Sequence, residues 1–128
     1  MPVTHQIDSE RNLITFIAYG LLKEHEYKEI RAKLVKDPSF RPGMDQIADF
    51  RAVEEHEVTQ EGRDQFLEQE IALKPLLGDC RQAIVAQSGL HYGLTRQLLV
   101  DLGASHEETQ VFYSIEEAQA WLFGEGEN

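Results

Sequence analysis

The stretch Asp37-Pro38-Ser39-Phe40-Arg41-Pro42-Gly43, followed shortly by Asp49-Phe50-Arg51, decides the fold. A helical pattern ends at Asp37, because Pro38 cannot continue a helix and favours extended geometry in the residue before it. Pro42-Gly43 suits a turn. Residues Met44 to Phe50 then predict a strand that ends beside an acid and a base. The segment therefore predicts a helix-to-strand junction.

The residues before this junction predict a hairpin and a helix. Thr4 to Asp8 and Leu13 to Tyr19 are expected to form antiparallel strands around a polar turn. Gly20 is expected to end the second strand. A helix follows, with apolar residues three and four positions apart on one face: Tyr27, Ile30, Leu34 and Val35.

The residues after the junction predict a second helix and a buried strand. Thr59 is expected to cap a helix that runs to about Lys74 and ends at Pro75. Its apolar side would consist of Phe66, Leu67, Ile71 and Leu73. The short apolar run from Ala83 to Ala86 is typical of a strand covered on both faces.

The last third of the chain predicts a helix, a strand and a helix. The first helix would carry Leu90, Leu94, Leu98 and Leu102, and Gly103 would end it. A strand ends at Val111-Phe112-Tyr113, and Ser114 with Glu117 forms a capping box for a helix that buries Ile115, Ala118, Trp121 and Leu122. The order ββαβαβαβα predicts a single α/β domain over residues 1–123, with 124–128 as a flexible tail. Its mixed sheet would be mostly parallel, with an antiparallel edge hairpin strand and helices packed over it.

Composition narrows the range of functions. The chain has 128 residues, enough for one core, and a formal net charge of −11. Phosphate groups need clustered cations, and Lys and Arg are scattered here, so we expect no nucleic-acid binding. We also expect no membrane span, no signal peptide, a cytoplasmic location and no cofactor. Cys80 is the only cysteine, which excludes an internal disulfide.

The order and spacing of several segments resemble the STAS-like domains, and most closely the SpoIIAA-like branch of small single-domain bacterial proteins. The resemblance covers nearly the whole chain. It rests on the opening segment, on Ala83 to Ala86 with Tyr92-Gly93-Leu94-Thr95-Arg96, and on Val111 to Ser114 with Glu117 to Leu122. It implies a mixed sheet covered by helices and no established catalytic chemistry. Members of the group act mainly as interaction modules in regulation, and some relatives hold nucleotides or apolar small molecules.

One departure from the family pattern concerns regulation. The antagonists of this family carry a phosphorylatable serine in a turn after the third strand. The corresponding residues here, Arg51 to Gln60, contain no serine and no glycine. Thr59 is the only hydroxyl in this region, and nearby glutamates would repel a phosphate. We therefore expect no inherited phosphorylation switch.

Two charged groups lie at the end of the third predicted strand. Asp49 and Arg51 lie two residues apart, so in a strand they point the same way, toward a ligand crevice or into a salt bridge with each other. The salt bridge is the simpler interpretation, because ion pairs are common. Glu54-Glu55-His56-Glu57 contains metal-binding residue types, but consecutive residues diverge in direction. We interpret this run as a solvated acidic loop rather than a metal site.

The fourth predicted strand leads into three further candidates. Ser88 follows it directly, where a helix cap or a nucleophile would lie, but Gln87-Ser88-Gly89-Leu90 matches no nucleophile motif. Tyr92 and Arg96 share one helical face. Either they hold an apolar or anionic small molecule beside Asp49, Arg51 and Ser88, or the helix is simply amphipathic and Arg96 pairs with one of the many surface acids. A Ser88–His91–Asp49 set can also be drawn, although such residues are expected by chance.

The sequence thus favours a non-enzymatic regulatory or interaction module that binds a protein partner or a small ligand. A homodimer through the hairpin edge strand fits this interpretation. The alternatives are a carrier or sensor of an apolar or anionic small molecule near Tyr92 and Arg96 and, less favoured, a small hydrolase.

Overall fold

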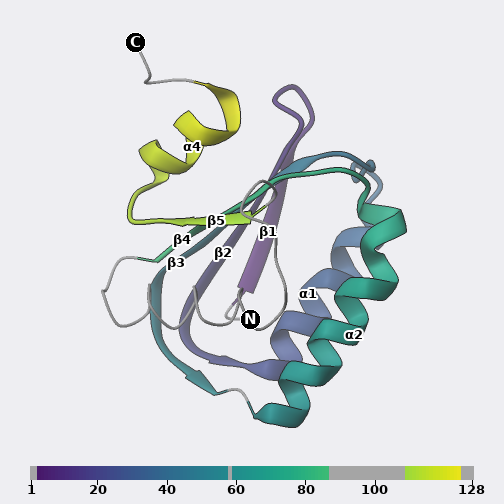
Figure 1. Cartoon of the computed structure of the whole chain (residues 1–128), viewed down its shortest axis with the longest axis vertical. Helices are drawn as coiled ribbons and strands as arrows, with labels where there is room; N and C mark the ends of the chain where they lie inside the picture. Colours follow the sequence, from purple (N-terminus) through teal and green to yellow (C-terminus); the bar gives the residue numbers. More distant parts are fainter. Residues whose placement is uncertain (1–2, 58, 87–108, 125–128) are drawn as a thin grey trace.

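A five-stranded mixed sheet forms the centre of the molecule (Figure 1). The computed structural model describes residues 3–57, 59–86 and 109–124. The strands lie side by side in chain order: β1 (Val3–Asp8), β2 (Leu13–Lys23), β3 (Asp45–Glu57), β4 (Gln82–Val85) and β5 (Thr109–Phe112). β1 is antiparallel to β2, and the remaining neighbours are parallel. The predicted α/β sheet with an antiparallel edge hairpin is confirmed.

Helices cover both faces of this sheet. α1 (Glu24–Lys36) and α2 (Gln60–Leu77) lie next to each other on one face, and α4 (Ile115–Phe123) lies on the other (Figure 1). The helix predicted from Leu90 to Leu102 falls outside the described residues. Among those that are described, no helix is long and apolar enough to cross a membrane.

Two apolar clusters fill the space between sheet and helices. Because successive strand residues point to opposite faces, neighbouring positions of β2 divide between the clusters. The cluster under α1 and α2 contains Val3, Ile14, Phe16, Ala18, Leu22, Ile30, Leu34, Met44, Val53 and Leu77. The cluster under α4 contains Leu13, Ile47, Ala83, Val85, Ala118 and Leu122.

The junction after α1 has the geometry that its prolines predict. Asp37 is extended, and its N–H donates to the carbonyl of Leu34 at 3.0 Å. The Asp37 carboxylate accepts a hydrogen bond from the N–H of Ser39 and lies 2.9 Å from Nε2 of His5 in β1. Gly43 takes a φ of +85°, and Met44 then enters the core. The junction thereby ties α1 to the edge strand.

The predicted ends of β2 and β3 are wrong. Both strands run further than expected, because they continue to pair with each other up to Lys23 and Glu57. Gly20 does not end β2: it lies inside the strand with a φ of +71°, beside two shifts of the β2–β3 register. Glycine adopts this left-handed conformation without strain, so it accommodates the bulge and lets pairing continue to Lys23. The predicted acidic loop after Arg51 is correspondingly strand, up to Glu57. Burial of Val53 in the core holds this extension in place.

The predicted end of α2 is also wrong. The helix passes Pro75 and ends at Leu77. Pro75 stands in the last turn, where its missing N–H removes one helical hydrogen bond, and the N–H of Gly78 closes the end on the carbonyl of Lys74 at 3.0 Å. The extra turn carries Leu77 into the core. Ile71, which was expected on the apolar side, is instead 65% exposed.

α4 is held at both ends. Ser114 caps it as predicted, since its hydroxyl oxygen accepts from the N–H of Glu117 at 3.1 Å. At the other end the guanidinium of Arg11 lies 4.4 Å from the ring centre of Phe123, and that of Arg81 lies 4.8 Å from the ring centre of Trp121. Arg81 also donates to the carbonyl of Leu122. The helix therefore crosses its face from the end of β5 toward the β1–β2 turn.

Candidate functional site

Asp49 and Arg51 of β3 form a two-pronged ion pair. Arg51 donates from Nε to Oδ1 of Asp49 and from Nη2 to Oδ2, both at 2.9 Å. Its backbone N–H donates to the same Oδ1 at 3.1 Å. The two side chains lie on one side of β3, as their spacing predicts, and the salt bridge is the arrangement that the structure shows. β3 continues well beyond them, so they do not stand at its end.

This pair alters the acidity of both groups. Burial raises the pKa of the Asp49 carboxyl, but the side-chain and backbone hydrogen bonds from Arg51 outweigh it, so the pKa lies below its ordinary value of 3.8. The hydrogen bond to Asp49 raises the pKa of Arg51, and the nearby charge of Glu116 adds to the effect. At neutral pH the pair is therefore ionised and locally neutral.

The pair lies where the shorter strands end. Asp49 is aligned with Val85, the last residue of β4, and with Ile17 of β2 on its other side. Ser88, Tyr92 and Arg96 follow β4 in the chain and fall outside the described residues. Asp49 and Arg51 are thus the two candidate ligand-binding residues that the structure brings together.

The region of the antagonist serine differs from the sequence-based expectation. Arg51 to Glu57 belong to β3 rather than to a loop, and Glu54 and Glu55 are exposed on it. Thr59 directly precedes α2 and is exposed. The acidic run is therefore held by strand pairing to Leu21, Leu22 and Lys23.

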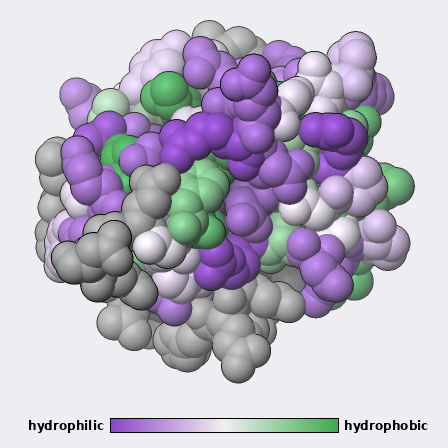
Figure 2. Space-filling model, turned by 90° about the horizontal axis from the view of Figure 1, so that it is seen from above, coloured by the Kyte–Doolittle hydropathy of each residue, from purple (hydrophilic) through white to green (hydrophobic). Residues whose placement is uncertain are grey.

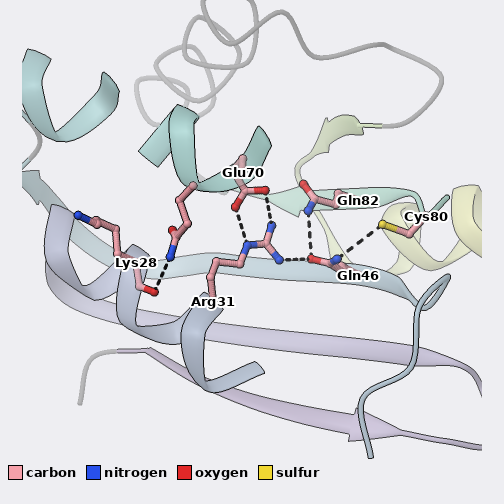
Figure 3. A network of polar contacts seen from close by, with 7 residues as sticks. Lys28, Arg31, Gln46, Glu70, Cys80 and Gln82 are labelled. Carbon is pink, nitrogen blue, oxygen red and sulfur yellow. Dashed lines mark hydrogen bonds and ion pairs between the residues drawn. The ribbon is translucent and has the colours of Figure 1, made fainter. Parts of the chain in front are cut away.

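A buried polar network between the helices and the sheet carried no recognised signal in the sequence (Figure 3). Arg31 of α1 donates to Glu70 of α2 at 2.7 Å and to Gln46 of β3 at 2.7 Å. Gln46 accepts a further hydrogen bond from Gln82 and donates to the sulfur of Cys80. Arg31 also lies over the ring of Phe16. Because these residues come from α1, α2 and three strands of the sheet, the network fixes α1 and α2 to the sheet.

Exposed apolar side chains on β2 are the second feature that sequence analysis missed. Ile17, Tyr19 and Leu21 are 38%, 46% and 41% exposed. These side chains occupy every second position of β2, a pattern that the sequence contains. The prediction that the strand ends at Gly20 left Leu21 outside the strand, so the pattern was not recognised. Figure 2 shows one face of the molecule, on which the coloured surface is mostly hydrophilic and hydrophobic residues form small separate spots.

No family model matches this chain, and no curated protein matches it. Solved structures show its fold. An uncharacterised protein of the DUF3478 family with a SpoIIAA-like fold, from Shewanella loihica PV-4, superposes with a TM-score of 0.62 at 17% identity, over 94% of this chain and 91% of that one.

The anti-sigma factor antagonist SpoIIAA in its unphosphorylated form superposes with a TM-score of 0.52 at 15% identity, over 90% of this chain and 91% of that one. At these identities the likeness concerns the fold. The chain therefore has the SpoIIAA-like fold that its sequence pattern resembles.

Proposed function

We propose that this chain is a non-enzymatic, cytoplasmic interaction module that pairs with protein partners, including a second copy of itself, through the outer edge of β1. The proposal rests on the outer edge of β1. Within the described part of the chain, no strand pairs with the outer side of β1. SpoIIAA, named as an antagonist of an anti-sigma factor, has the same fold, which supports a role in binding proteins.

The composition of β1 favours pairing. Natural edge strands usually carry a lysine, a proline or a bulge that blocks addition of another strand. The six residues Val3–Asp8 contain neither lysine nor proline. Their pairing with β2 is regular, without a register shift. A strand from a second copy can therefore add to this edge with ordinary backbone hydrogen bonds.

Native mass spectrometry and sedimentation velocity test the edge. We expect a dimer for the wild-type protein. In a two-fold antiparallel pairing centred on β1, the exposed Gln6 would lie close to its copy, so Gln6→Lys places like charges together and weakens the dimer about tenfold or more. Gln60→Lys, at an exposed position on α2, is the matched control. A wild-type protein that stays monomeric at its solubility limit and pairs with no partner strand would overturn the proposal.

A second candidate function, binding of a small anionic or apolar molecule, rests on Asp49 and Arg51. Arg51 keeps 40% of its side chain exposed while Asp49 fixes its orientation. We propose Ser88, Tyr92 and Arg96 as further contacts. The same native mass spectra would show a retained ligand as added mass, and Arg51→Met should abolish it. Spectra without added mass, together with unchanged melting temperatures across a metabolite panel, would exclude this function.

A further inference from the structure

We draw no further inference here: the strongest candidate, the surface patch of exposed apolar side chains at Ile71 and Leu76 in the carboxyl-terminal half of α2, is a helix face for which nothing in the part of the chain that the structure describes shows what covers it.

Discussion

At the scale of single residues, the buried Arg31–Glu70 ion pair is a site where loss of one partner should strongly destabilise the fold. The Arg31 side chain is 10% exposed, and three groups share its guanidinium: Glu70, Gln46 and the ring of Phe16. Removing one member of a buried pair leaves the other charge without compensation, whereas replacing both by apolar residues of similar size is close to neutral. The pair thus fixes where α1 and α2 dock more than it adds net stability.

We predict that Glu70→Ala lowers the free energy of unfolding by about 3 kcal/mol. The double variant Arg31→Met with Glu70→Leu should lose less, because it leaves no unpaired charge, and Gln46 still accepts from Gln82. Urea unfolding at pH 7 measures both values, with unchanged slopes as a sign that the unfolded state is the same. A double variant that is less stable than Glu70→Ala would contradict the prediction.

Asp49 gives a prediction for acid stability. Its pKa in the folded protein lies below 3.8, so the unfolded chain takes up the proton first as the pH falls. The stabilisation is therefore present above the unfolded-state pKa and is lost as the pH falls through the folded-state value. Asp49→Asn should lose less stability than the wild type on acidification below about pH 4. Arg51→Met should raise the pKa of the Asp49 carboxyl, because it removes the side-chain hydrogen bonds that lower it. An NMR titration in which Asp49 of the wild-type protein titrates at or above 3.8 would contradict the prediction.

At the scale of elements, two glycines with similar backbone geometry do different work. Gly20 in β2 has a φ of +71°, and an added Cβ would meet no atom within 4 Å. Gly78 after α2 has a φ of +73°, but a Cβ there would lie 2.9 Å from the N of Gly43 and 3.3 Å from Cβ of Pro42. The first position needs glycine for conformation alone, and the second needs it for conformation and space.

Substitution at these glycines should separate the two effects. Gly20→Ala is expected to cost about 1–2 kcal/mol from backbone strain, and Gly20→Asn less, because Asn tolerates the left-handed region. Gly78→Ala should cost about 3 kcal/mol, since displacement of the 42–43 turn adds to the strain. Thermal and urea unfolding of the three variants would give these values. If Gly20→Ala and Gly78→Ala lower the free energy of unfolding equally, the close approach of residue 78 to Gly43 adds no cost of its own.

At the scale of the whole molecule, the sequence predicted correctly those features that depend only on residues close together in the chain. Pro38 and Ser114 fixed the end of one helix and the start of another, and the spacing of Asp49 and Arg51 placed them on one side of a strand. Gly20 misled the prediction, because the end of β2 depends on pairing with β3, which lies some thirty residues away along the chain. Likewise Arg31 and Glu70 meet across 39 residues without any local signature. Non-local pairing and burial therefore set the features that sequence analysis missed.

The net charge of −11 leads to a salt effect on folding. Like charges repel one another in the compact state, and added salt screens them, so the urea midpoint should rise between about 0.01 M and 0.5 M NaCl. Choline chloride should reproduce this trend, because screening depends on ionic strength rather than on the cation. A midpoint that falls with salt would show that local ion pairs outweigh the net repulsion.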